Sequence, residues 1–189
     1  TGSTERASGE LAHPLEDGAA HRHLAAEHED PIRVETPERL RRGEVVAAVT
    51  ASGASIAGCN SWPLGRMRYV AAASPGFIAR HFAQGVSAAA LAPAPVMVYD
   101  RKERLPQQWL QAPGLDTRTH APQHFLPSNF GYVRACEVGM GWGIHPTGLI
   151  GRQLAHGSLV QLLPGMALDM PLFWTHPRSA QAALERLTQ

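Results

Sequence analysis

Polar residues at one predicted helix start are the first place where this chain could bind a ligand. Ser128 and Asn129 precede a segment with helical apolar spacing, where a side-chain oxygen can cap a helix by accepting a backbone N–H. The free N–H groups of such a helix start, with the positive end of its dipole, can also hold an anion or a carboxylate. We therefore treat residues Ser128 to Phe130 as a candidate carboxylate site. A cap without a ligand is the alternative, and one serine can serve both purposes.

Two further polar positions follow runs that we interpret as buried strands. Thr50, Ala51 and Ser52 come after an apolar run centred on residues 45–49, and Asp100 ends the run Pro95–Asp100. In open α/β sheets ligands bind beyond the carboxyl ends of the strands. These residues are accordingly candidates for the edge of a pocket. Asp100 is followed by Arg101 and Lys102, so a surface ion pair is the other interpretation.

The elements that would position these residues alternate between strand and helix. The run Glu44–Thr50 is nearly all apolar, which predicts a central parallel strand covered on both faces. After Ser128, residues Tyr132, Val133, Cys136 and Met140 fall at roughly helical spacing, and Gly139 supplies a stop.

Later segments continue this alternation. A helix over residues 147–156 ends at Gly157, and a strand over 170–175 precedes a closing helix. We predict an α/β fold with a mostly parallel sheet, arranged as two lobes joined by crossing strands with a cleft between them.

Composition limits the classes of function. Lys and Arg number 17 against 16 Asp and Glu, so the composition lacks the excess of positive charge that is typical of nucleic-acid-binding proteins. The cysteines Cys59 and Cys136 are not spaced as metal ligands, and free thiols in a reducing cytosol are expected. No apolar run approaches the length of about 20 residues that spans a bilayer, and no secretory signal is recognisable.

The N-terminal segment from Thr1 to Asp30 is poor in apolar residues and predicts loop or disorder, with at most a short helix. His21, His23 and His28 could ligate a metal along a helix face, but a solvated tail is the more ordinary interpretation. We expect neither a metal nor a cofactor.

Five ordered motifs carry a resemblance to a known family. They are Glu38-Arg39-Leu40-Arg41-Arg42-Gly43-Glu44-Val45-Val46-Ala47-Ala48-Val49-Thr50, Pro63-Leu64-Gly65-Arg66-Met67-Arg68-Tyr69, Val98-Tyr99-Asp100-Arg101-Lys102, Pro127-Ser128 with Gly139-Met140-Gly141-Trp142-Gly143, and Pro171-Leu172-Phe173-Trp174. Together they resemble the effector-binding half of LysR-type transcriptional regulators, and more narrowly the branch that controls export of lysine and arginine.

The resemblance implies a cytoplasmic, homo-oligomeric sensor with two Rossmann-like lobes, similar to type II periplasmic binding proteins. Lobe I would comprise residues 31–66 and 170–189, and lobe II residues 67–169, with residues 1–30 divergent or poorly structured. The effector would be lysine, arginine or a related amino acid. DNA would be bound only through a winged helix-turn-helix that is not recognisable in this chain, and no membrane partner is implied.

The same resemblance suggests roles for individual residues. Ser128 with the N–H groups of Asn129 and Phe130 would bind the effector's carboxylate, and Asp100 its amino group. Thr50 and Ser52 would face it from the other lobe. Relatives usually carry an acid or small polar group where Phe130 stands, and often an acid where Thr147 stands, so the carboxylate end is the better-supported half of the site.

Two other classes of protein remain as alternatives. A two-lobed solute-binding protein for amino acids would have the same shape but needs export. An enzyme would need a catalytic motif, and the chain has no Gly-x-Ser-x-Gly elbow, phosphate loop or His-Glu-x-x-His helix. His145 and Ser128 could act as base and nucleophile only if the fold brought them together. We expect a protein that is not an enzyme.

Overall fold

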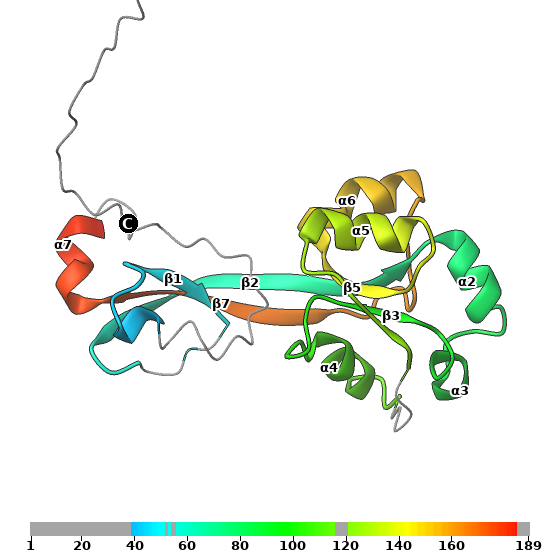
Figure 1. Ribbon diagram of the computed structural model, residues 1–189, viewed down its shortest axis with the longest axis horizontal. Helices are drawn as coiled ribbons and strands as arrows, with labels where there is room; N and C mark the ends of the chain where they lie inside the picture. Colours follow the sequence, from blue (N-terminus) through cyan, green and yellow to red (C-terminus); the bar gives the residue numbers. More distant parts are fainter. Residues whose placement is uncertain (1–38, 52, 54–55, 116–120, 185–189) are drawn as a thin grey trace, which may run out of the picture.

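Two long strands organise the molecule. The computed structural model describes residues 39–51, 53, 56–115 and 121–184. Strands β2 (Cys59–Ala73) and β7 (Leu168–Pro177) run along its length and join two ends of unequal size (Figure 1). We call the end that holds β1 (Ala48–Thr50), η1 (Arg178–Ala180) and α7 (Gln181–Leu184) the small half. The large half holds the other elements, from α2 to β6.

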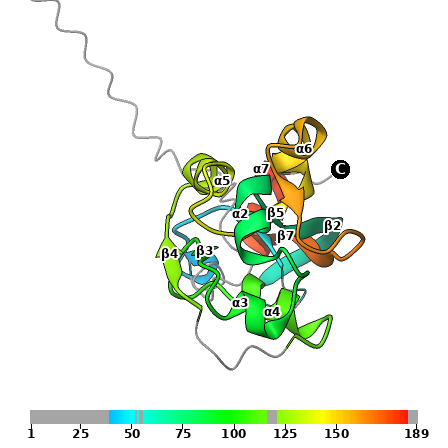
Figure 2. The same cartoon turned by 90° about the vertical axis from the view of Figure 1, so that its right-hand side faces the viewer.

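The large half contains the remaining helices and strands, which Figure 2 shows end-on with helices on either side of the strands. In chain order they are α2 (Pro75–His81), α3 (Ala88–Leu91), β3 (Val96–Val98), α4 (Leu105–Gln111), β4 (Gln123–Phe125), α5 (Asn129–Glu137), β5 (Gly143–Pro146), α6 (Thr147–His156) and β6 (Val160–Gln161). None of the described helices is both long and apolar enough to cross a membrane.

The ladder between β2 and β7 is antiparallel and extends from the pair Cys59–Pro177 to the pair Tyr69–Leu168. Its register shifts between Pro63 and Gly65, where Gly65 has a φ of 119°. Proline lacks the N–H that a ladder needs, and glycine reaches this φ without a steric clash, so the bulge forms here. On the large-half side, Arg68 donates two hydrogen bonds to Asp169, at 2.8 and 2.9 Å.

The larger sheet has the strand order β1-β7-β2-β5, with β6 also paired to β2, and these pairings are all antiparallel. Parallel pairing occurs between β3 and β4 and at the bridge from Val96 to Trp142. The α/β class with two lobes joined by crossing strands is confirmed. The expectation of a mostly parallel sheet is wrong for the described residues.

The prediction for the run Glu44–Thr50 also fails in detail. Only Ala48–Thr50 is strand, and in the described part of the chain it lies at the end of the sheet and pairs antiparallel with β7. Val45 and Ala48 are instead buried with Leu40 in a small cluster. An apolar run signals burial, and here a helical turn and a loop supply part of that burial in place of neighbouring strands.

Several helix boundaries follow local capping chemistry, including those predicted at Ser128, Gly139 and Gly157. Ser87 and Ser128 cap α3 and α5, each accepting a backbone N–H at 3.2 Å. Gly139 and Gly157, with φ of 81° and 72°, follow the ends of α5 and α6. Met140 lies beyond the stop at Gly139 and is exposed, so its predicted place on the buried helix face is wrong.

Two apolar clusters fill the large half, one on each face of β2 and β5. The first contains Phe77, Trp109, Trp142 and Ile144, and the second contains Val70, Tyr132, Cys136 and Ile150. Trp109 and Trp142 are buried against each other with ring centroids 5.8 Å apart. Trp142 therefore belongs to the core.

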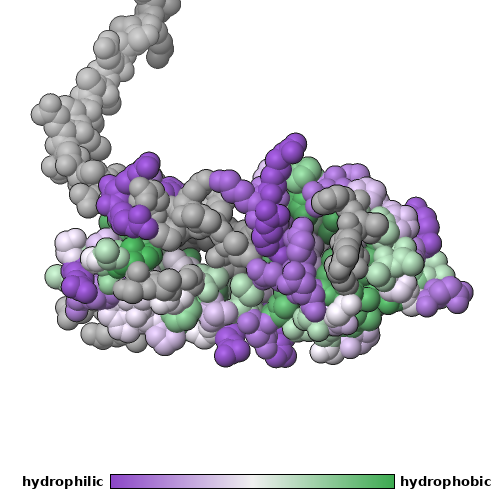
Figure 3. All heavy atoms as spheres, turned by 90° about the horizontal axis from the view of Figure 1, so that it is seen from below, coloured by the Kyte–Doolittle hydropathy of each residue, from purple (hydrophilic) through white to green (hydrophobic). Residues whose placement is uncertain are grey.

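Hydrophilic and apolar side chains are unevenly distributed on the surface. On the face seen from below, hydrophilic side chains gather in a band across the middle of the molecule, beside apolar areas over the large half (Figure 3). The two halves therefore meet along a hydrophilic part of that face.

Candidate functional site

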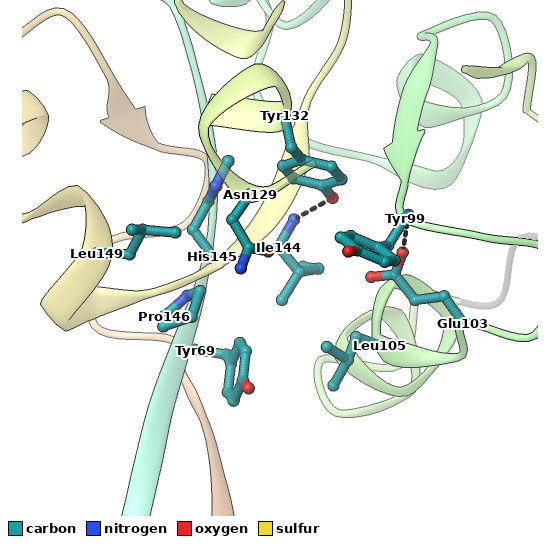
Figure 4. Close-up of a pocket in the computed structure, with 10 residues that line it drawn as sticks. All are labelled: Tyr69, Tyr99, Glu103, Leu105, Asn129, Tyr132, Ile144, His145, Pro146 and Leu149. Carbon is teal, nitrogen blue, oxygen red and sulfur yellow. Dashed lines mark hydrogen bonds between the residues drawn. The ribbon is translucent and has the colours of Figure 1, made fainter. Parts of the chain in front are cut away.

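A small cavity lies in the large half, where α4, α5, α6 and β5 converge on β2 (Figure 4). Its volume is about 60 Å³, which is above the roughly 10–15 Å³ that a site needs to hold a water molecule. Its lining consists of Tyr69, Tyr99, Glu103, Leu105, Asn129, Tyr132, Ile144, His145, Pro146 and Leu149. A site of this kind, apolar with a few convergent polar groups, is the usual form of a small-molecule pocket.

The acid of this lining is Glu103, which stands between β3 and α4. It is 5% exposed, and its carboxylate accepts a hydrogen bond from the backbone N–H of Tyr99. Asp100 shapes the intervening turn, because its Oδ1 accepts the N–H groups of Lys102 at 2.7 Å and Glu103 at 3.0 Å. The turn thus directs Glu103 inward (Figure 4).

The N-terminus of α5 forms another wall. Ser128 has an extended backbone, with φ of −152°, and its Oγ accepts the N–H of Gly131 at 3.2 Å. Asn129, the first helical residue, lines the cavity. Phe130 points away, since it is 82% exposed. The first N–H groups of a helix have no partner within the helix, so this wall offers hydrogen-bond donors and a positive dipole end.

Tyr132 fixes the geometry between α5 and β5. Its hydroxyl donates to the carbonyl of Met97 at 2.8 Å and accepts the N–H of Ile144 at 3.2 Å. Gly143 makes room for the ring, because a Cβ there would lie 2.6 Å from it. Tyr132 is therefore a structural part of the wall.

His145 is fully buried on β5 and packs edge-on against Tyr132, with ring centroids 5.1 Å apart. Neither ring nitrogen has a hydrogen-bond partner among the described residues. Burial lowers the pKa of His145 to about 3, so the imidazole is neutral at physiological pH. Because no hydrogen bond joins it to Ser128, the base and nucleophile pair of an enzyme is not formed among these residues.

The structure distributes the predicted site residues unequally. Asn129 lines the cavity, Ser128 caps the adjoining helix, and Asp100 belongs to the turn that orients Glu103. Thr50 lies at the end of β1 in the small half and is 8% exposed. Ser52 lies outside the described residues, as do His21, His23 and His28.

Sequence reasoning missed Glu103 as a pocket residue and considered His145 only as a catalytic base. Glu103 follows Arg101 and Lys102, and such a charged run is typical of a solvated surface. The signal in the sequence is its position three residues after Asp100, just beyond the same buried strand.

The described residues contain no group of three or more His, Cys, Asp or Glu that could hold a metal. Cys59 and Cys136 are free, as predicted. Burial is the main cause that raises the pKa of Cys136 to about 12, so this thiol stays protonated and unreactive at neutral pH.

Comparison with known proteins gives a consistent result. Residues 33–189 match the family model described as the LysR substrate binding domain. The chain is similar to the HTH-type transcriptional regulator ArgP of Pseudomonas aeruginosa, with 42% identity over 152 residues, which are 80% of this chain and 50% of that protein. It thus spans about half the length of the curated relatives that it matches.

Solved structures agree in fold. The C-terminal domains of a LysR family protein from Agrobacterium tumefaciens superpose with a TM-score of 0.78 at 48% identity, covering 83% of this chain and 75% of that one. Full-length LysG from Corynebacterium glutamicum with bound effector Arg gives a TM-score of 0.71 at 30% identity, covering 82% and 52%. These matches confirm the expected periplasmic-binding-protein-like fold.

The relatives named as ArgP and LysG are transcriptional regulators, which agrees with the expectation that the protein is not an enzyme. The family match covers most of the residues, and the fold and the sequence identity point the same way. The chain therefore belongs to the family of LysR substrate-binding domains.

Proposed function

We propose that this chain is the effector-sensing part of a LysR-type transcriptional regulator and that it binds a small basic amino acid in the cleft between its lobes, beside the cavity at the start of α5. The observation that carries the proposal is the buried carboxylate of Glu103 in a small pocket next to a helix N-terminus. Together these groups offer one partner for a cation and one for a carboxylate. The LysG relative of Corynebacterium glutamicum, which carries bound Arg, supports this choice of ligand.

The roles of the site residues follow from chemistry and from the family likeness. Ser128 and the N–H groups of Asn129 and Phe130 bind the effector's carboxylate, because the start of α5 supplies donors and positive potential. The carboxylate of Asp100 accepts a hydrogen bond from the effector's amino group.

The other lobe contributes hydroxyl groups to the same effector. Thr50, which ends β1 in the small half, supplies one of these groups, and Ser52 supplies the other.

In the intact regulator the small half belongs to lobe I, residues 31–66 and 170–189, and the large half to lobe II, residues 67–169. Effector binding between the lobes shifts the balance between two arrangements of the assembly, by an amount set by its differential affinity for them. The assembly is a cytoplasmic homo-oligomer that contacts DNA through a winged helix-turn-helix outside these residues. An amino-acid exporter is the proposed regulated gene.

Calorimetric titration of the full 189-residue chain tests this function. Arginine, lysine and ornithine are titrated alongside glycine and glutamate, and saturable binding of the basic amino acids is expected. A flat trace for every amino acid would contradict the proposal.

The substitution Ser128→Ala tests the carboxylate wall. It removes the cap that accepts Gly131 N–H, at a cost of roughly 0.5–2 kcal/mol to stability, and it weakens effector binding because the first turn of α5 is less well held. Ser87→Ala is the matched control, since Ser87 caps α3 in the same way and does not line the cavity. Equal losses of binding in both variants would argue against a role of Ser128 in the site.

A further inference from the structure

Tyr99 lies where two neighbouring strands end. It directly follows β3, whose last pair with β4 joins Val98 to Phe125, and the N–H of Leu126 donates to the carbonyl of Val98 at 3.0 Å. The two strands are parallel, so their carboxyl ends lie at one edge, and α/β folds bind ligands beyond such edges. The chain after β4 leads into α5, so Tyr99 stands beside the wall proposed to bind the effector's carboxylate.

The ring of Tyr99 is accessible from the cavity. Tyr99 is half-buried and lines this space, and Figure 4 shows its ring pointing inward from the end of β3 toward Ile144. Among the described residues, no other aromatic ring and no guanidinium group stacks on it. The nearby guanidinium of Arg101 lies over the ring of Phe125 instead, 5.2 Å from the centroid, and Arg101 is not part of the lining. The ring of Tyr99 can therefore receive a group from a ligand.

The main chain fixes the position from which this ring extends. The N–H of Tyr99 donates to the carboxylate of Glu103. Within the same turn, Asp100 accepts the N–H groups of Lys102 and Glu103. The bond from Tyr99 uses only its main chain, so it can persist when the side chain is replaced. A substitution at this position thus tests the ring alone.

The aromatic part of the lining suits a cation. Of the residues that the structure describes, the lining includes the rings of Tyr69, Tyr99 and Tyr132 and no lysine or arginine. The face of an aromatic ring is negative, and it attracts guanidinium and ammonium groups most strongly where water is excluded. Tyr69 and Tyr132 are buried, and Tyr132 is held in the wall by two hydrogen bonds of its hydroxyl. Tyr99 is therefore the tyrosine that a ligand in the cleft reaches most directly.

We infer that Tyr99 is a specificity-determining residue of the effector site, and that its ring binds the guanidinium or ammonium group at the end of the effector's side chain through a cation–π interaction. This inference rests on the proposed function and adds to it a contact that distinguishes basic from neutral amino acids. Ser128 and Asp100 keep the effector's carboxylate and amino group, so its side chain extends from the start of α5 toward the end of β3.

The experiment compares arginine with citrulline, which has nearly the same shape but carries a neutral urea group in place of the guanidinium. Both are titrated by calorimetry into the full 189-residue chain and into its variants Tyr99→Leu and Tyr99→Phe. Leucine removes the aromatic face and keeps an apolar side chain, whereas phenylalanine removes only the hydroxyl.

The wild-type chain is expected to bind arginine more tightly than citrulline, by roughly three- to thirtyfold for one cation–π contact. Tyr99→Leu is expected to lose most of this preference through weaker arginine binding. Tyr99→Phe is expected to keep most of it, since the face of the ring remains.

Fluorinated phenylalanines at position 99 separate the electrostatic contact from packing. Each fluorine withdraws electrons from the face of the ring and changes the shape of the side chain little. The affinity for arginine is therefore expected to fall stepwise from phenylalanine to its singly and triply fluorinated forms, while the affinity for citrulline stays nearly constant. This series provides the second test if Tyr99→Leu folds poorly.

Phe125→Leu is the matched control. Phe125 is an aromatic residue of β4 that pairs with Val98, the residue before Tyr99, and it does not line the cavity. Its variant is expected to keep the wild-type preference.

Three results would overturn the inference. They are equal wild-type affinity for arginine and citrulline, an unchanged preference in Tyr99→Leu or across the fluorinated series, and an equal loss of preference in Phe125→Leu. Each of these leaves effector binding itself intact, so it is distinguishable from failure of the proposed function, in which no amino acid binds the wild-type chain.

Discussion

The two halves of the molecule are packed very differently. In the large half, two clusters built around β2 and β5 bury bulky side chains such as Trp109, Trp142 and Ile150. In the described part of the small half, the cluster of fully buried apolar residues consists of Leu40, Val45 and Ala48. The cavity walls come from the well-packed half and from the β2 residue Tyr69, where that half begins. A binding site that must hold its geometry is thus set into the more rigid part of the chain.

The largest test of this difference is Trp142→Ala. Trp142 is 1% exposed and packs on Trp109, so its removal should lower the free energy of unfolding by about 3–5 kcal/mol. Leu40→Ala, the comparable deletion in the small half, should cost about 2 kcal/mol, because a sparse cluster can collapse around the gap. Urea unfolding followed by circular dichroism measures both. Equal losses of unfolding free energy in the two variants would show that the two halves are packed equally well.

The second test concerns the close packing of α5 on β5. A Cβ at Gly143 would lie 2.6 Å from the ring of Tyr132, whose hydroxyl is held by two hydrogen bonds. Gly143→Ala should therefore destabilise the fold by about 1–3 kcal/mol through overpacking.

The matched control is Gly151→Ala in α6, where an added Cβ meets nothing within 4 Å. This change should stabilise the helix by about 0.5–1 kcal/mol. Thermal melts of both variants distinguish tight packing from a general effect of replacing glycine. An unchanged melting temperature for Gly143→Ala would mean that the packing of α5 on β5 can adjust to the added methyl group.

The smallest expected effect is a pH dependence. The pKa of His145 is about 3 in the folded chain, below its ordinary value of 6.5, so the unfolded chain binds more protons between these limits. Stability is therefore complete above about pH 6.5 and falls as the pH drops, by roughly 1–2 kcal/mol between pH 6.5 and pH 5.

His145→Leu should reduce this slope in urea unfolding at stepped pH, since it removes both the proton site and two unsatisfied ring nitrogens. Other groups contribute equally to the wild-type and variant curves. An identical slope in the two proteins would show that His145 does not titrate as its burial requires.

Local chemistry explains which elements were predictable from the sequence. The limits of α5 follow from Ser128 and Gly139, because a cap and a left-handed stop act within one turn of the helix. The stop of α6 at Gly157 has the same basis. The α/β class and the crossing strands also follow from pattern and family likeness.

Long-range pairing was not predictable in the same way. The direction of β1 depends on its contact with β7, where Ala48 pairs with Thr175, and nothing near residue 48 encodes that choice. The role of Glu103 was hidden for a related reason. Its neighbours Arg101 and Lys102 suggest solvent, and only the turn made by Asp100 directs the carboxylate inward.

The bulge in the β2–β7 ladder has a mechanical consequence. All chain that passes between the halves in the described structure runs through these two strands, and their register shifts between Pro63 and Gly65. A proline without an N–H and a glycine at φ of 119° interrupt the ladder at that point. The hydrogen-bonded pairing of the two connecting strands is therefore weakest there. A rotation of one half against the other would meet the least resistance from strand pairing at residues 63–65.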